Sequence, residues 1–191
     1  FGEYIFVEET KYKVLTGVAR LTKDGQSVSG DTFSMINLPS GELLMALSDG
    51  MGSGTSAFDD SKNVIELLEQ MSEAGFSQTS AIRLINSLYV SDQEFENYAT
   101  LDISLINLYK GECSFLKNGA VGTYVLNQGK MYCIEGQSLP MGVVSDAEPY
   151  IGKMSLYPGD YVIMMTDGVA DMFSQERYNL EKFIKQIEIV N

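Results

Sequence analysis

The sequence of 191 residues contains no histidine. This absence excludes histidine-based catalytic triads, histidine-rich zinc sites and an imidazole acting as general acid. Any chemistry must therefore use carboxylates, hydroxyls, backbone groups, lysine or a metal ion. Long apolar runs are also missing, since the longest, such as Tyr161–Met165, fall far short of the roughly 20 residues that a membrane span requires. We therefore expect no membrane contact by this part of the protein.

Cysteine and proline are scarce. The two cysteines, Cys113 and Cys133, are too few and too far apart for a zinc knuckle. Both lie in strand-like segments, where we expect buried, reduced thiols, and this favours a cytoplasmic setting. The four prolines form no linker, and the length suits one domain over residues 1–191.

Basic residues are few, with 13 Lys and Arg against 26 Asp and Glu, which gives a formal net charge of −13. A chain this acidic repels phosphate backbones, so nucleic acid is not expected as a partner. The acidic residues are spread along the chain, and most of them are expected only to keep the protein soluble. A cation site would use a small number of them.

Alternation of apolar and polar residues predicts strands in ten segments. The middle four are separated by turn residues at hairpin spacing, which predicts an antiparallel meander from residue 100 to residue 134, and the last two are expected to pair around Pro158-Gly159. The segments are Tyr4–Glu8, Tyr12–Arg20, Ser34–Asn37, Leu43–Ser48, Thr100–Tyr109, Cys113–Lys117, Gly122–Leu126, Lys130–Ile134, Lys153–Tyr157 and Asp160–Thr166.

Apolar residues recur at helical spacing over 57–71 and again over 81–89. Gly75 is a natural stop for the first helix, and Ser77 or Thr79 is placed to cap the second. The short link predicts an antiparallel helix pair, and a last helix is expected at about Leu180–Ile187. Strands, a helix pair and a closing helix predict an α/β layered domain of the α+β type, with mostly antiparallel sheet.

Three segments share one design, in which an apolar strand is followed by an aspartate beside glycine. They are SGDTF around Asp31, MALSDGMGSG around Asp49 and IMMTDGV around Asp167. Carboxylates at strand ends suit Mg²⁺ and Mn²⁺, which prefer oxygen ligands and keep several waters. The following glycine lets a backbone carbonyl approach the ion. Asp-Gly is equally typical of ordinary turns, so the pattern alone leaves both interpretations open.

Taken together, these segments resemble the PP2C-type (PPM) metal-dependent protein phosphatase family, and within it the branch of the bacterial stage II sporulation protein E phosphatase domains. The resemblance implies a four-layer αββα sandwich of two antiparallel sheets flanked by helices. The motifs that carry it appear in the family's order, with SGD at 29–31, SDGMGSG at 48–54, ATLD at 99–102, SLPMG at 138–142 and MTDGV at 165–169.

The resemblance implies a centre of two Mn²⁺ or Mg²⁺ ions that hydrolyses phosphoserine or phosphothreonine on a protein. Asp49 is then expected to bridge the ions, Asp31 and the Gly50 carbonyl to serve one of them, and Asp167 to bind the other, so that the three aspartates are the catalytic residues. The implied substrate is a phosphorylated anti-anti-sigma factor in sporulation sigma-factor control. The chain is then expected to be a cytoplasmic domain of a larger, membrane-anchored bacterial protein.

The family also closes with an Asn/Asp-Asp motif on a late strand, which supplies another carboxylate to the ion at Asp167. No aspartate follows Asp171 here, so we expect the domain to lack that strand and its acidic motif. Asp171 is expected in a loop or capping a turn, and Asp102 is expected to hold a strand end. The alternatives are a non-catalytic or metal-poor module for binding or dimerisation, and a related stress-response phosphatase.

The helix pair 57–90 has two interpretations. It directly follows the loop at Asp49, and the resemblance implies that these helices form a regulatory switch and a homodimer contact. The plainer interpretation is a helical hairpin that covers the core.

Overall fold

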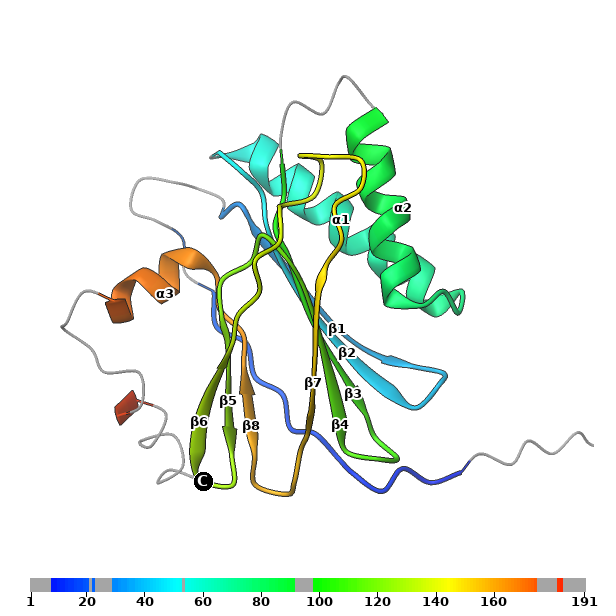
Figure 1. The fold of residues 1–191 in the computed structure, drawn as a ribbon, viewed down its shortest axis with the longest axis vertical. Helices are drawn as coiled ribbons and strands as arrows, with labels where there is room; N and C mark the ends of the chain where they lie inside the picture. The colour runs from blue at the N-terminus through cyan, green and yellow to red at the C-terminus, as the bar shows by residue number, and fades with distance from the viewer. Residues whose placement is uncertain are drawn as a thin grey trace, which may run out of the picture.

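The computed structural model describes residues 8–20, 22, 29–52, 54–91, 98–174 and 182–183. These residues form a five-stranded sheet of order β1-β2-β3-β4-β7 and a three-stranded sheet of order β6-β5-β8, antiparallel throughout (Figure 1). The elements are β1 (Asp31–Leu38), β2 (Glu42–Asp49), α1 (Thr55–Glu73), α2 (Gln78–Ser91), β3 (Leu101–Asn107), β4 (Glu112–Asn118), β5 (Thr123–Asn127), β6 (Lys130–Ile134), β7 (Tyr150–Ser155), β8 (Tyr161–Ile163) and α3 (Asp167–Ser174).

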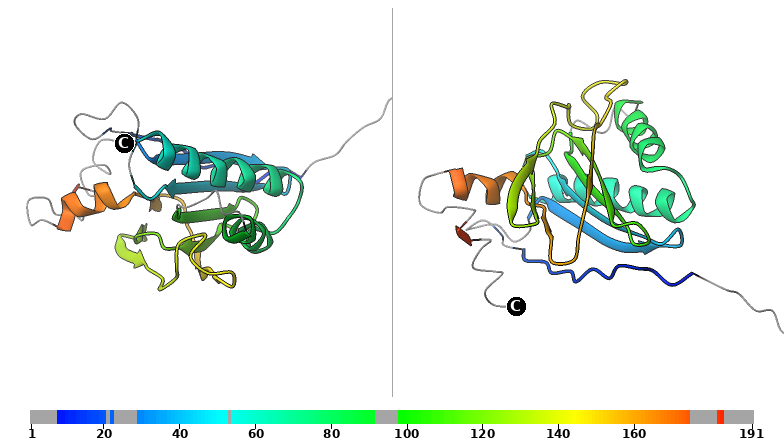
Figure 2. Two further views of the ribbon diagram at one scale, coloured as in Figure 1. Left: turned by 90° about the horizontal axis from the view of Figure 1, so that it is seen from above. Right: turned by 60° about the horizontal axis from the view of Figure 1, so that its bottom comes forward.

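The central strands of the larger sheet are buried on both faces, and their successive residues alternate between two apolar clusters. Leu44 on β2 packs with α1 and α2, whereas its neighbour Leu43 packs with Val125 of the smaller sheet. Figure 2 shows α1 lying along β1 and β2. The predicted domain of two antiparallel sheets with helices is therefore confirmed.

The predicted helix pair is also confirmed. Gly75, the residue after the C-cap Ala74 of α1, is in a left-handed conformation, with φ of 87°, which a glycine adopts without strain. The Ser77 hydroxyl then accepts a hydrogen bond from the Ser80 N–H at 3.2 Å and so caps α2.

The predicted meander was wrong at its centre, because β4 pairs with β3 and β7 while β5 pairs with β6 and β8. The hairpin expected around residues 158–159 was wrong for the same reason, since its two strands belong to different sheets. The Asp160 carboxylate accepts hydrogen bonds from the Tyr157 N–H, the Gln128 N–H and the Asn127 amide, each at 2.8 Å. These bonds hold the turn against the end of β5 and direct β8 into the smaller sheet.

The strand expected over Tyr12–Arg20 was wrong. Its start is held by a hydrogen bond from the Tyr12 N–H to the Leu108 carbonyl at 2.9 Å, but apolar side chains such as Leu15, which is 100% exposed, pack against no surface formed by the described residues. The alternating pattern therefore has no buried face here. Two further predicted elements fall almost wholly outside the described residues: Tyr4–Glu8 and Leu180–Ile187.

The scarce residue types behave largely as expected. Both cysteines are free thiols, and Cys113 is buried, but Cys133 is exposed because it lies on the edge strand β6. In the part of the chain that the structure describes, every helix is too short or too polar to cross a membrane.

Leu68, on the face of α1 that meets α2 and the larger sheet, provides a test of this core. The side chain is fully buried, so Leu68→Ala should lower the free energy of unfolding by about 2–5 kcal/mol through the cavity it leaves. Leu84→Ala, on the exposed side of α2, should change it by no more than about 0.5 kcal/mol. Urea denaturation measures both, and equal losses would contradict this placement of the core.

Candidate metal centre

Asp31 and Asp49 meet because they lie at the open end of the first strand pair. Asp31 begins β1 and Asp49 ends β2, and the antiparallel register makes them direct partners. Asp167 comes from the other side of the domain, as the first residue of α3 after β8. The structure thus brings together the three aspartates that the sequence singled out, from three different elements.

Asp49 has the most perturbed carboxyl group of the three. Its pKa is raised from 3.8 to about 7, first because it is partly removed from water and then because the carboxylates of Asp31 and Asp167 lie close to it. Each neighbouring negative charge makes ionisation of Asp49 less favourable. The site is therefore a set of neighbouring carboxyl groups, in which the charges of Asp31 and Asp167 oppose the ionisation of Asp49.

Two hydroxyl groups orient Asp31. Ser29 and Thr166 each donate a hydrogen bond to its Oδ2 at 3.2 Å, and Thr166 is also the residue that precedes Asp167. Arg20 donates to the Asp31 carbonyl at 2.8 Å. Ser29 and Thr166 lie inside the motifs SGD and MTDGV but carry no signal of their own, and nothing in the sequence around Arg20 indicates its contact.

Gly50 lies in a space that admits no side chain. A Cβ atom there would be 1.9 Å from the Ala57 carbonyl oxygen at the start of α1. On the other side, Thr100 pairs with Asp49 through its N–H, at 2.8 Å, and its hydroxyl, at 3.0 Å. The second Asp-Gly motif differs, because a Cβ on Gly168 would meet no described atom within 4 Å. The two motifs therefore look alike in sequence but impose different constraints.

Asp49 and Asp167 line a small pocket of about 120 Å³. Thr100, Thr166 and Asp102 also contribute to its wall. A larger hollow of about 410 Å³ lies between α1 and α2, but Glu66 is its only acidic lining residue among those described, so it does not resemble a metal site.

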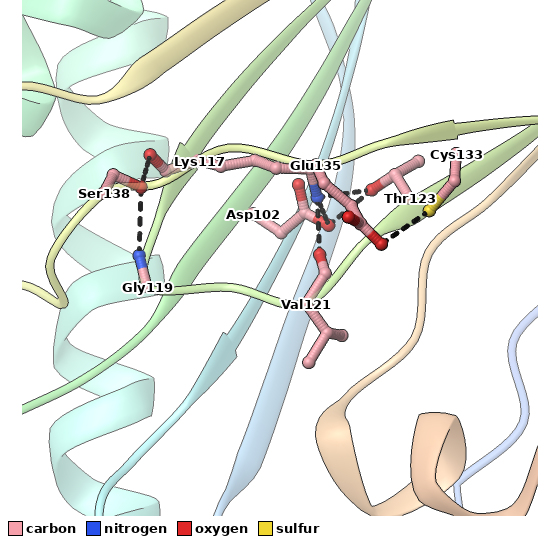
Figure 3. A network of polar contacts seen from close by, with 8 residues as sticks. All are labelled: Asp102, Lys117, Gly119, Val121, Thr123, Cys133, Glu135 and Ser138. Carbon is pink, nitrogen blue, oxygen red and sulfur yellow. Dashed lines mark hydrogen bonds and ion pairs between the residues drawn. The ribbon is translucent and has the colours of Figure 1, made fainter. Parts of the chain in front are cut away.

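Asp102, which lines this pocket, belongs to a buried ion pair. Figure 3 shows the polar contacts of that pair. Lys117 and Asp102 are direct cross-strand partners on β4 and β3, with Nζ and Oδ2 2.8 Å apart and side chains 0% and 2% exposed. Thr123, from β5, donates to the same oxygen at 2.6 Å. Burial raises the pKa of Asp102, and Lys117 and Thr123 oppose that rise. Asp102 thus joins the two sheets, whereas the sequence suggested only a residue that holds a strand end.

Lys117 was missed as a site residue, although the sequence carried a signal for it. Along β4, the residues that face the smaller sheet are Cys113, Phe115 and then Lys117. A charge at an inward position of a strand requires a buried partner.

Asp171 lies in α3, so its expected place in a loop or turn was wrong. The helix begins at Asp167 because the Thr166 carbonyl accepts hydrogen bonds from the N–H groups of Val169 and Ala170, at 3.1 and 3.0 Å. Asp171 follows Asp167 by one helical turn and lies on the same side of α3.

Within the described ranges, no group of three or more His, Cys, Asp or Glu side chains is already arranged to hold a metal ion. The chemistry of the donors nevertheless fits one. Asp31, Asp49, Asp167 and the Gly50 carbonyl offer hard oxygen donors, and the pKa of Asp49 is raised first by burial and then by the neighbouring charges of Asp31 and Asp167, which a divalent cation would offset. The residues present therefore fit Mg²⁺ or Mn²⁺.

Comparison with known proteins gives a consistent picture. Residues 39–190 match the family model for stage II sporulation protein E. The chain is 35% identical over 169 residues to stage II sporulation protein E of Bacillus subtilis, which covers 88% of this chain and 20% of that protein. The structure of the PP2C phosphatase domain of that protein with a fragment of its regulatory domain has a TM-score of 0.82 and 32% identity, covering 94% of this chain and 53% of that one.

A second relative is the phosphoserine phosphatase RsbX of Bacillus subtilis, 40% identical over 65 residues, which are 34% of this chain and 32% of that protein. A structure of RsbX in complex with magnesium has a TM-score of 0.65 and 26% identity, covering 78% of this chain and 71% of that one. The present chain thus spans about a fifth of the length of the sporulation protein that it matches.

The different surroundings of the two Asp-Gly motifs can be tested. Gly50→Ala should lower the free energy of unfolding by about 1–3 kcal/mol, because its Cβ must displace the backbone of α1 at Ala57. Gly168→Ala is the same substitution beside the other aspartate. It should leave the free energy of unfolding unchanged or raise it by up to about 1 kcal/mol, since Gly168 lies in α3 and alanine favours helix. Chemical denaturation of both variants decides, and similar destabilisation by the two would contradict the packing described for Gly50.

The raised pKa of Asp49 predicts how the stability of the metal-free protein depends on pH. Between pH 3.8 and about 7 the folded state keeps a proton on Asp49 that the unfolded state has released, so the free energy of unfolding should fall as pH rises through this window and level off above it. Asp49→Asn should remove the contribution of Asp49 to this decrease in the free energy of unfolding. Asp146→Asn, at an exposed site, should leave the decrease as it is in the wild type. Melting temperatures in chelator measure the effect; parallel curves for the wild type and Asp49→Asn would refute it.

Proposed function

The chain belongs to the stage II sporulation protein E family of PP2C-type phosphatases, and from this premise we propose that it is a metal-dependent protein-serine/threonine phosphatase. The observation that carries the proposal is that the carboxylates of Asp31 and Asp167 lie close to Asp49, and that Asp49 and Asp167 line a small pocket. A phosphate monoester is a dianion and cannot approach such a site unless its negative charge is first neutralised.

Among the described residues, some are placed to bind two divalent ions and others to orient those that bind. Asp31, Asp49, Asp167 and the Gly50 carbonyl would supply the oxygen ligands, and Ser29 and Thr166 fix the direction of Asp31. When bound, a pair of Mn²⁺ or Mg²⁺ ions neutralises the phosphate and activates water for in-line attack. The packing of Gly50 against Ala57 keeps the Asp49 loop at one distance from α1, so the ligands are held before an ion arrives.

The proposed substrate is phosphoserine or phosphothreonine on a protein, and specifically a phosphorylated anti-anti-sigma factor in sporulation sigma-factor control. The family membership and the similarity to a phosphoserine phosphatase support this choice. A small pocket lined from strand ends and the start of a helix suits a phosphorylated side chain that a partner protein presents. The proposal includes a cytoplasmic location within a larger, membrane-anchored protein, and a homodimer formed through the helix pair.

Two alternatives have specific support. A non-catalytic, metal-poor module for binding or dimerisation is favoured by the lack, among the described side chains, of a finished metal-binding group. A stress-response phosphatase with another phosphoprotein substrate is favoured by the similarity to RsbX. The binding module would have no phosphatase activity, so turnover separates it from the proposal. The stress-response phosphatase would act on another phosphoprotein, so substrate choice separates it.

The proposal predicts that Mn²⁺ binding and phosphatase turnover depend together on Asp49. Calorimetry should detect Mn²⁺ binding by the wild type, and p-nitrophenyl phosphate and a phosphoserine peptide should both be hydrolysed. Asp49→Ala should abolish binding of at least one ion and lower turnover by roughly 100-fold or more, because a ligand and its charge are lost. Asp146→Ala makes the same change of charge at an exposed site and should leave both measurements unchanged.

Other results would favour the alternatives. Tight Mn²⁺ binding without turnover of either substrate would contradict a phosphatase and support a binding module. Turnover that persists in Asp49→Ala would show that the centre lies elsewhere. Hydrolysis of phosphopeptides without activity on a phosphorylated anti-anti-sigma factor would support the stress-response alternative.

A further inference from the structure

The polar network around Lys117 is complete except at one atom. The Lys117 ammonium has three hydrogens, and it donates to Asp102 Oδ2, Thr123 Oγ1 and the Val121 carbonyl, each at 2.8 Å (Figure 3). Thr123 passes its own hydrogen to Asp102 Oδ2 at 2.6 Å. The other carboxylate oxygen, Asp102 Oδ1, is buried and has no hydrogen-bond partner in the described part of the chain.

An oxygen of this kind requires a partner. Leaving a buried carboxylate oxygen without a hydrogen bond is unfavourable, and such atoms in native proteins are usually satisfied by protein or by ordered water. Lys117 and Thr123 are already fully used, so neither of them can turn to Oδ1. The missing partner is therefore a group that enters from outside the network.

The position of Asp102 indicates where that partner lies. Asp102 lines the same pocket of about 120 Å³ as Asp49 and Asp167. Thr100, two residues earlier and on the same face of the chain, donates its N–H to the Asp49 carbonyl at 2.8 Å. A water molecule takes about 30 Å³ and needs two to four polar partners, so the pocket has both the room and the polar wall to hold ordered water.

We propose that Asp102 is a positioning residue of the metal centre, whose Oδ1 accepts a hydrogen bond from a water that hydrates the divalent cations held by Asp49 and Asp167. This role rests on the proposed function. Lys117 favours the ionised carboxylate, and Thr123 fixes its rotation, so Oδ1 remains an acceptor with one direction. The ion pair acts as an outer support of the centre, of the kind that commonly orients the ligands and waters around a metal ion.

A purely structural ion pair has different properties. A buried pair that only joins two sheets can be replaced by apolar residues of similar volume, often without loss of stability, and such a replacement leaves a distant site unaffected. The positioning role instead requires an acceptor at one atom. Asp102→Asn tests this directly, because the amide oxygen can still accept from Lys117 and Thr123, and the NH₂ group then replaces Oδ1 and turns the acceptor into a donor.

The experiment measures Mn²⁺ affinity by calorimetry, with the melting temperature and p-nitrophenyl phosphate kinetics recorded for each variant. Asp102→Asn should raise the dissociation constant for Mn²⁺ by about 10–100-fold. In Asp102→Asn the buried Lys117 ammonium loses its charged partner, which could prevent folding. In that case the double variant Asp102→Asn with Lys117→Met is used instead, because it removes the ammonium as well, and it should show the same loss of Mn²⁺ affinity. Ser104→Ala is the control, since Ser104 lies on the same face of β3, is fully buried and does not line the pocket.

The outcomes separate this role from the proposed function. Mn²⁺ affinity within about twofold of the wild type in a folded Asp102→Asn or double variant would overturn the positioning role and leave the phosphatase proposal intact. A loss of affinity as large in Ser104→Ala would also overturn it, because the effect would then be a general one on the sheet. Failure of the unaltered protein to bind Mn²⁺ or hydrolyse phosphate would overturn the proposed function itself, and the role of Asp102 with it.

Discussion

Repulsion among three carboxylates is the constraint on which this domain is organised. Asp31 and Asp49 come from the same end of a strand pair and Asp167 from the start of a helix, and partial burial together with the two neighbouring carboxylates raises the pKa of Asp49. An isolated loop would move the charges apart. Here the β1–β2 register, the hydroxyls of Ser29 and Thr166 and the contact between Gly50 and Ala57 prevent it. The folded core supplies the energy that keeps the charges together.

The core joins the two sheets by two kinds of contact. Apolar side chains such as Phe115 and Val125 pack between the sheets, and Asp102, Lys117 and Thr123 add a directional link among them. A buried polar link fixes relative position more tightly than apolar contact does, because it tolerates little sliding. Its place next to the pocket means that the alignment of the sheets and the shape of the site are set by the same residues.

The sequence was most informative where one local signal sufficed. The three aspartate motifs, the two helices with their Gly75 and Ser77 boundaries and most strands follow from periodicity and turn chemistry. Strand partners did not, because a turn residue says that the chain reverses but not which sheet it joins. That choice depended on Asp160, whose three hydrogen bonds involve side chains and backbone from two distant turns. The partners of Asp31 and the ion pair between Lys117 and Asp102 likewise depend on contacts across the fold, which no local pattern records.

The chain passes from one sheet to the other and back, and this order affects how the protein folds. After β4 the chain leaves the larger sheet to build β5 and β6, and it returns with β7 to complete the first sheet before β8 completes the second. Neither sheet is whole until residues 150–163 are available. During synthesis on the ribosome, β4 and β5 each wait with an open edge for a strand that is translated later, so the inner apolar layer closes in a late step and the growing chain is exposed to edge pairing until then.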